Sequence, residues 1–342
     1  MARIALDAMG GDFAPDATIA GALHALLEIE PAHTIQLVGR GSVVRERLSA
    51  LAVHDLAPAA DLLDRLEIID AAEVIDMSDK PSQAVRSKPN SSMIVGLKLQ
   101  ADGLSDAFVS AGSTGAQMAA STVLLKLHAG LTRPAIGTLF PTARKPVVVL
   151  DSGANVDCSP QELVQFARLG AVYAEDLLGR RNPAVGLLSI GEEREKGNAV
   201  VKEANHLLEL SGLNFLGNVE GRDIPAGASD RGDLDVVVCD GFVGNVLLKF
   251  YEAVTPMIVD MIARHTGREA RELAAGLRQL DYSEHGGAPL LGVRGVSIIC
   301  HGKSSPRAIK NAIRVALRAV ESDMSAHIGR HLGEAVPVPS IQ

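Results

Sequence analysis

Asp240, Gly241, Gly244 and Asn245 form a polar segment between two apolar runs. The run before it, with three valines in succession, is typical of a strand buried on both faces of a parallel sheet. The run after it is typical of the start of a buried helix. A strand that ends in glycines and opens a helix brings backbone N–H groups toward an anionic ligand. Asn245 adds a side-chain amide, which could bind that ligand or cap the helix.

A second polar segment, residues 191–198, carries more charge than a simple connection needs. Lys196 and Asn198 flank a glycine within it. An ammonium group placed beside a flexible glycine could stabilise an oxyanion that develops during a reaction. The alternative interpretation is a lysine on a solvated surface.

Four further polar turns follow apolar runs elsewhere in the chain, and they combine glycines with carboxylates, hydroxyls and amides. A single glycine-rich turn is weak evidence for a binding site, but each of these turns lies between an expected strand and an expected helix, which is the context that such a site requires. Together, the turns predict a site for a phosphate group. The candidate binding residues are Asp7, Gly10, Gly11, Gly112, Ser113, Thr114, Gly115, Asp151, Asn155, Asn198, Asp240, Gly244 and His301.

The elements that position these residues alternate between strand and helix, which predicts an α/β fold with a doubly wound, largely parallel sheet. One of the expected strands spans residues 185–190. We expect a single large α/β unit over residues 1–335 and a frayed tail at 336–342. Ligands of such sheets bind at the carboxyl ends of the strands. The turns after Leu6, Ser110, Leu150, Ile190, Cys239 and Cys300 are therefore expected to share one sheet edge.

Several reaction types have no matching motif. No serine lies in a G-x-S-x-G nucleophile elbow. Cys239 and Cys300 lie in or at the end of apolar strands, where a thiol is most often a small core residue. Histidines and cysteines do not have zinc-ligand spacing. The aspartates of the turns could hold a divalent cation or could order the turns, and we expect neither a metal nor a cofactor.

The composition of the chain bears on its binding partners and its place in the cell. The chain has 342 residues, a formal net charge of −8, 3% aromatic residues and no Trp, which disfavours nucleic-acid binding. No apolar run reaches the roughly 18 residues that would predict a membrane-spanning helix. We expect no signal peptide at the N-terminus. Three widely spaced cysteines indicate a reducing cytosol rather than a disulfide framework.

Residues 250–285 are expected to form an amphipathic helical excursion. Apolar residues recur there at 254, 257, 258, 261 and 262, which is the spacing of one helical face. Arginines follow this face. The pattern fits a core or dimer helix pair, and it also fits a helix that lies on a membrane surface.

Motifs along nearly the whole chain resemble the PlsX family of phosphate acyltransferases. The matching segments are ALDAMGGD (5–12), SAGSTGA (110–116), LDSGANVDC (150–158), GLLSIGEE (186–193) with KGN (196–198), NFLGNVEGRDI (214–224), VVVCDGFVGNVLLK (236–249), GAPLLGV (287–293) and the HG-x-S-S loop at 301–305.

The resemblance implies a reaction in bacterial phospholipid synthesis. A long-chain acyl group would pass from acyl carrier protein to inorganic phosphate, and a glycerol-3-phosphate acyltransferase would then use the acyl phosphate. It also implies a fold similar to phosphotransacetylases and to isocitrate and isopropylmalate dehydrogenases. Lys196 and Asn245 become the catalytic candidates because they lie in the KGN and DGFVGN motifs.

The same resemblance implies a cytoplasmic homodimer, peripherally bound to a membrane surface through about residues 254–280. Two alternatives remain at this stage. One is a dehydrogenase of the same fold, although no G-x-G-x-x-G fingerprint follows the first strand. The other is a regulatory module that binds phosphate or a nucleotide without turnover.

Overall fold

Parallel pairing of short buried strands organises the chain. The computed structural model describes residues 1–54, 62–266 and 286–333. The chain divides into two compact units, which we call unit 1 (Met1–His128 and His285–Ala326) and unit 2 (Ala129–Glu284 and His327–Gln342). The expectation of one α/β unit over 1–335 stays a prediction.

The sheet of unit 1 has the strand order β3-β2-β1-β4-β14-β13. Its strands are β1 (Arg3–Asp7), β2 (Thr34–Gly39), β3 (Leu66–Asp70), β4 (Ala107–Ser110), β13 (Ala288–Leu291) and β14 (Ser297–Ile299). All neighbours in this order pair in parallel except β13 and β14, which are antiparallel. The turns after β1, β4 and β14 therefore lie at one carboxyl edge.

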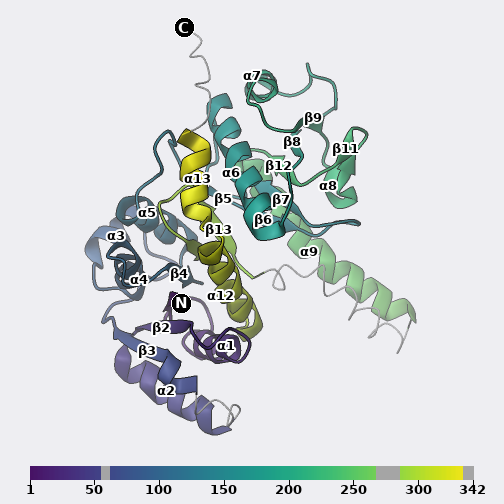
Figure 1. Cartoon of the computed structure of the whole chain (residues 1–342). Helices are drawn as coiled ribbons and strands as arrows, with labels where there is room; N and C mark the ends of the chain where they lie inside the picture. The colour runs from purple at the N-terminus through teal and green to yellow at the C-terminus, as the bar shows by residue number, and fades with distance from the viewer. Residues whose placement is uncertain (55–61, 267–285, 334–342) are drawn as a thin grey trace. The chain divides into compact units, whose positions relative to one another are not determined.

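Helices connect these strands in unit 1 (Figure 1). They are α1 (Asp16–Leu26), α2 (Gly41–His54), α3 (Pro81–Ser87), α4 (Ser92–Ala101), α5 (Thr114–Leu124) and α12 (Pro306–Glu321). Helices α5 and α12 begin at serine caps, because Ser113 accepts from Ala116 N–H and Ser305 accepts from Ala308 N–H. Each cap places a helix start directly after a polar turn.

The sheet of unit 2 has the order β6-β7-β12-β8-β9. Its strands are β6 (Thr138–Phe140), β7 (Val147–Leu150), β8 (Val185–Leu188), β9 (Phe215–Val219) and β12 (Val236–Val238). The short strand β5 (Ala135–Ile136) is not part of this sheet, and β10 (Ala228–Ser229) and β11 (Gly232–Asp233) form a separate antiparallel pair. The pairs β7–β12, β12–β8 and β8–β9 are parallel, whereas β6–β7 is antiparallel. Val238 is in register with both Leu150 and Leu187, so three neighbouring strands end together.

The remaining described helices are α6 (Pro160–Leu178), α7 (Ala199–Glu209), α8 (Asp223–Ala226), α9 (Gly241–Thr266) and α13 (Met324–Gly333). The capping box of Ser159 and Glu162 starts α6, and Gly179 ends it with a φ of 65°. No helix within the described ranges is long and apolar enough to cross a bilayer.

The apolar runs form the core as predicted. Every residue of 147–150 and 236–238 is fully buried, which fits strands covered on both faces. Each aliphatic side chain removed from water stabilises the fold by about 1.5–3 kcal/mol. The α/β class and the largely parallel pairing are confirmed.

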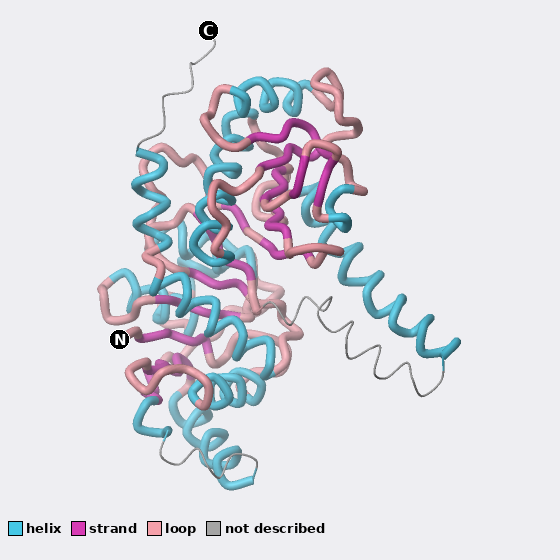
Figure 2. The backbone as a smooth tube through the Cα atoms, turned by 45° about the vertical axis from the view of Figure 1, so that its right-hand side comes forward, coloured by secondary structure: helices cyan, strands magenta, loops and turns pink. Residues whose placement is uncertain are grey.

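Two local expectations are wrong. The strand expected over 185–190 ends at Leu188, and Ile190 beyond it is 82% exposed. The helix after Asp240 is buried only in part: Leu247 and Leu248 pack against the core, whereas Val246 and Phe250 are 54% and 62% exposed. Figures 1 and 2 show α9 extending well beyond the strands of its own unit, so the far end of the helix does not pack on that sheet.

The crossing of α1 and α12 in unit 1 depends on a glycine. A Cβ atom at Gly21 would lie 2.6 Å from the Ile309 Cβ and 2.8 Å from the Pro306 carbonyl oxygen. We predict that Gly21→Ala lowers the free energy of unfolding by about 1–3 kcal/mol, because overpacking forces the helices apart. Glycine-to-alanine changes inside helices usually stabilise instead, by about 0.5–1 kcal/mol.

Scanning calorimetry measures this effect, with Gly333→Ala as the control, because a Cβ atom at Gly333 meets open space. An unchanged or raised melting temperature for Gly21→Ala would contradict the close approach.

Candidate active site

Three polar turns lie at the carboxyl edge of the unit 2 sheet. They follow β7, β12 and β8, which are neighbours and parallel. Seven of the residues chosen from the sequence belong to these turns or to the helix starts beside them: Asp151, Asn155, Lys196, Asn198, Asp240, Gly244 and Asn245. This edge is the candidate active site of unit 2.

Asp151 anchors the first turn. Its side chain is fully buried, and Oδ1 accepts from the N–H groups of Ile136 (3.0 Å) and Ala154 (3.1 Å). Oδ2 accepts from the backbone N–H (2.6 Å) and the side-chain amide (2.9 Å) of Asn155. Burial raises the pKa of Asp151, and these hydrogen bonds oppose that shift. Both oxygens are engaged within the protein, so Asp151 shapes the turn, and its contact with phosphate stays a prediction.

The Asp151 turn packs closely on the start of α9. The Gly241 N–H donates to the Asn155 carbonyl at 2.7 Å, and a Cβ atom at Gly244 would collide with the Asp151 carbonyl oxygen. Asp240 Oδ1 accepts from Val243 N–H at 2.8 Å and so caps the helix. The sequence predicts that this turn offers its N–H groups to an anion; instead those of Gly241 and Val243 are bound within the protein.

Asn245 is the fifth residue of α9, so it is not the helix cap. Its side chain is exposed, and the ideal Cβ position of Gly153 lies 3.3 Å from the Asn245 Cβ. No hydrogen bond links its amide to another side chain or carbonyl of the described ranges. Asn245 therefore stands beside the Asp151 turn with a donor available to a ligand.

Lys196 lies in the turn after β8. Its stem crosses Gly191, whose ideal Cβ position is 2.8 Å from the Lys196 Cγ, and its ammonium group is exposed. No carboxylate within the described ranges forms an ion pair with it. Gly197 follows with a φ of 102°, and Asn198 then accepts from Val201 N–H to cap α7. Asn198 thus has a positioning role in this turn.

Ser189 is a candidate that the sequence reasoning missed. It follows β8 directly, and its Oγ is buried without a hydrogen-bond partner within the described part of the chain. That oxygen lies 3.0 Å from the ideal Cβ position of Gly197. The signal was available, since the first polar residue after a parallel strand is placed at the ligand edge. The predicted extension of the strand to Ile190 concealed it.

The polar turns of unit 1 meet at a separate carboxyl edge. A Cβ atom at Gly10 would lie 2.9 Å from the Gly112 nitrogen, and one at Gly11 would lie 3.0 Å from the Gly302 carbonyl oxygen. Asp7 is buried beneath them and accepts from Ser110 Oγ at 2.7 Å. Burial raises the pKa of Asp7, against hydrogen bonds from Ser92 and Ser110. Asp7, like Asp151, orders a turn.

The start of α5 completes this edge of unit 1. Thr114 and Gly115 lie in its first turn, where a helix provides no carbonyl for their N–H groups. The helix dipole favours an anion at this end. Ser113 is the helix cap, and His301 is exposed, with Nδ1 accepting from Lys303 N–H. The backbone donors at the start of α5 are of the kind that binds an anion, and the phosphate-binding role of these residues stays a prediction.

The expectation that six turns share one sheet edge is wrong. The turns after β1, β4 and β14 belong to the sheet of unit 1, and those after β7, β8 and β12 belong to the sheet of unit 2. Alternation of strands and helices looks the same in both units, so the sequence pattern does not show where one sheet ends and another begins.

The three thiols are poor nucleophiles at neutral pH. Burial raises the pKa of Cys158 and of Cys300 to about 12, and burial together with the nearby Asp240 and Asp151 raises that of Cys239 well above its usual value. Within the described ranges, no group of three or more His, Cys, Asp or Glu side chains is placed to hold a metal ion. The chemistry of these residues is therefore hydrogen bonding and charge stabilisation.

Comparison with known proteins agrees with this chemistry. A family model described as "Fatty acid synthesis protein" matches residues 2–327. The phosphate acyltransferase of Desulforamulus reducens is 47% identical over 333 residues, covering 95% of each chain. That of Heliobacterium modesticaldum is 46% identical over 347 residues, covering 98% of this chain and 99% of the relative.

Two solved structures show a similar fold. A phosphotransacetylase from Streptococcus pyogenes has a TM-score of 0.64 at 18% identity and covers 94% of each chain. A branched-chain phosphotransacylase from Enterococcus faecalis V583 has a TM-score of 0.57 at 14% identity, covering 94% of this chain and 99% of that one. The phosphotransacetylase-like fold is therefore confirmed.

The anchoring role of Asp151 gives a stability prediction. In Asp151→Asn, an NH₂ group replaces one acceptor oxygen and faces N–H donors, so at least one buried donor loses its partner. We expect the free energy of unfolding to fall by about 1–3 kcal/mol. Chemical denaturation measures the change, with the exposed Asp157→Asn as the matched control. Equal stability of the two variants would show that the Asp151 bonds do not hold the turn.

Proposed function

Because the chain belongs to the fatty acid synthesis protein family, we propose that it is a phosphate acyltransferase that transfers a long-chain fatty acyl group from a thioester to inorganic phosphate. The match to phosphate acyltransferases over nearly the full length of both chains is the observation that carries this proposal. We propose acyl carrier protein as the donor. The acyl phosphate would serve phospholipid synthesis, through a glycerol-3-phosphate acyltransferase.

The candidate active site of unit 2 supports a reaction without an acyl-enzyme. Cys158 and Cys239 near this edge stay protonated at neutral pH, so neither is a ready nucleophile. Lys196 and Asn245 instead present an ammonium group and an amide. Phosphate is itself a nucleophile, and holding it close to the thioester supplies much of the rate enhancement. The eight candidate residues of the unit 1 edge remain proposed phosphate-binding residues.

The proposed step is a direct displacement. A phosphate oxygen forms a bond to the thioester carbonyl carbon, whose oxygen becomes an oxyanion. Lys196 and Asn245 donate hydrogen bonds to this oxyanion or to the phosphate, and such donors act most strongly where charge develops. The intermediate then breaks its C–S bond. The sulfur leaves with the bonding electron pair and takes a proton from water, which gives the free thiol and the acyl phosphate.

The acyltransferase proposal can be tested by incubating the protein with palmitoyl-carrier protein and phosphate, and trapping acyl phosphate as a hydroxamate. A dehydrogenase of this fold would bind NAD and form no hydroxamate. A regulatory phosphate-binding module would show neither NAD binding nor turnover. The absence of hydroxamate with a carrier-protein donor would contradict the proposal.

The exposed face of α9 supports a further proposal, that the protein is a cytoplasmic homodimer associated peripherally with a membrane. Phe242, Val246, Phe250, Met257 and Met261 are all more than half exposed, and their spacing puts them on one side of the helix. An apolar stripe of this kind is typical of a surface that contacts a partner or a lipid interface. Residues 267–280 of the expected segment lie outside the described residues.

Lys196 and Asn245 give the first prediction of this proposal. Lys196→Ala and Asn245→Ala should each lower turnover by about 10²-fold, the usual effect of losing an oxyanion donor. Steady-state kinetics measures this, and Lys202→Ala, which removes another exposed lysine, is the control. Wild-type turnover in a correctly folded variant would refute the catalytic assignment.

Ser189 gives the second prediction of this proposal. If its unpartnered hydroxyl binds phosphate, Ser189→Ala should raise the KM for phosphate by about 10-fold, because a hydrogen bond to a charged group contributes about 1.5–3 kcal/mol. Ser189→Thr keeps a hydroxyl and should keep a KM near that of the wild type. If KM is unchanged in the alanine variant, Ser189 does not contact phosphate.

The part of α9 that carries Met261 gives the third prediction of this proposal. Met261→Glu places a carboxylate on the apolar face and should reduce binding to vesicles rich in phosphatidylglycerol, as measured by co-sedimentation. Val123→Glu, at an exposed apolar position on α5, should bind as the wild type does. Undiminished vesicle binding of Met261→Glu would exclude this face as the anchor.

A further inference from the structure

A cavity of about 430 Å³ lies at the amino-terminal edge of the unit 2 sheet. Its walls come from three places: residues 144–145 before β7, residues 179–181 after α6, and residues 227 and 233–235 before β12. β7 runs from this cavity to the Asp151 turn, a distance of about 13 Å for four strand residues. The cavity therefore shares no residue with the candidate active site.

The charge of the cavity is opposite to that of the chain. Arg144, Lys145, Arg180 and Arg181 line it, against two aspartates, whereas the whole chain has a net charge of −8. Cations at the end of α6 also complement the helix dipole, which accounts for the two arginines after that helix. The helix dipole does not account for Arg144 and Lys145, which come from a different segment.

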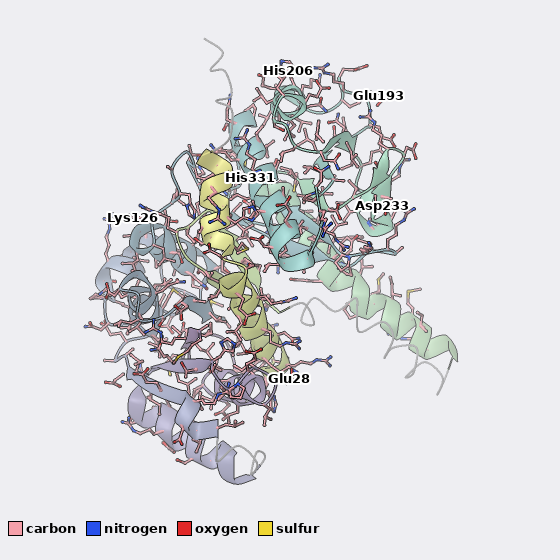
Figure 3. All side chains as sticks on the ribbon, in the orientation of Figure 1. Glu28, Lys126, Glu193, His206, Asp233 and His331 are labelled. Carbon is pink, nitrogen blue, oxygen red and sulfur yellow. The ribbon has the colours of Figure 1, made fainter. Side chains whose placement is uncertain are left out.

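The two aspartates hold two of the arginines in place. Arg144 forms an ion pair with Asp233, which is labelled in Figure 3. Arg180 Nε lies 3.3 Å from Asp235 Oδ1, while Asp235 Oδ2 accepts from Ala184 N–H at 2.9 Å. A guanidinium group has five N–H donors, and each of these ion pairs involves one nitrogen; Arg180 Nε makes no hydrogen bond within the described part of the chain. Each guanidinium is thus oriented by a carboxylate and has donors left for a ligand.

Lys145 and Arg181 supply the surplus charge. Both are exposed, and neither forms an ion pair with a carboxylate in the described ranges. With the two arginine–aspartate pairs neutralised, they leave two positive charges at the cavity. A phosphate monoester carries close to two negative charges at neutral pH.

We propose that this cavity binds a small organic molecule through its phosphate monoester group. Guanidinium groups match the geometry of phosphate oxygens and bind them through two hydrogen bonds at once. The volume is within the range of about 300–1,000 Å³ that ligand sites occupy. Leu234 and the glycines at 179 and 227 provide uncharged surface for the organic part.

Isothermal titration tests this with adenosine 5′-monophosphate as the probe and adenosine as its uncharged counterpart. We expect the intact protein to bind the monophosphate and not adenosine. The double variant Lys145→Glu, Arg181→Glu should raise the Kd at least about 10-fold, a loss of about 1.4 kcal/mol. Lys202→Glu, a charge reversal on α7, should leave the Kd unchanged.

The Lys196→Ala variant separates this site from the catalytic proposal, because it should bind the probe as the wild type does even if its turnover is lost. Absence of monophosphate binding to the wild type would overturn the proposal. So would equal binding by the double variant, or loss of binding in Lys196→Ala.

Discussion

The four hydrogen bonds that end on the Asp151 carboxylate hold the candidate active site together. They fix the turn after β7, and that turn receives the start of α9 so closely that the backbone permits only glycine at 241 and 244. Asn245 can stand beside the turn only because α9 begins at this place. Burial makes each lost bond costly, so one buried acid determines where an exposed amide lies.

The two units differ in the kind of hydrogen-bond donor that they offer to the proposed phosphate. At the unit 2 edge, the N–H groups of Gly241 and Val243 already have acceptors, and the proposed ligand contacts are the side chains of Lys196, Asn245 and Ser189. At the unit 1 edge, the first turn of α5 provides backbone donors. Neither edge relies on a reactive thiol. Hydrogen-bond donors without a reactive thiol suit the proposed reaction, in which the substrate phosphate is itself the nucleophile.

Local patterns predict much of this fold. The valine runs before Asp151 and Asp240 identify buried parallel strands, because no polar residue interrupts them. The division into two sheets was not predictable, since both units show the same alternation. The exposure of α9 was not predictable for a similar reason. The apolar residues of a helix have the same spacing whether or not other parts of the protein cover that face. Asn198 and Ser113 cap helices, and helix caps and anion sites select the same side chains, so their phosphate-binding role stays a prediction.

In the proposed reaction, phosphate attacks the thioester directly and no acyl group is bound covalently to the protein. Rapid mixing of the protein with palmitoyl-carrier protein, in the presence and absence of phosphate, tests this by following thiol release. We expect no burst of thiol without phosphate, and one acyl phosphate for each thiol released when phosphate is present. A burst of thiol equal to the amount of protein, in phosphate-free buffer, would contradict the account.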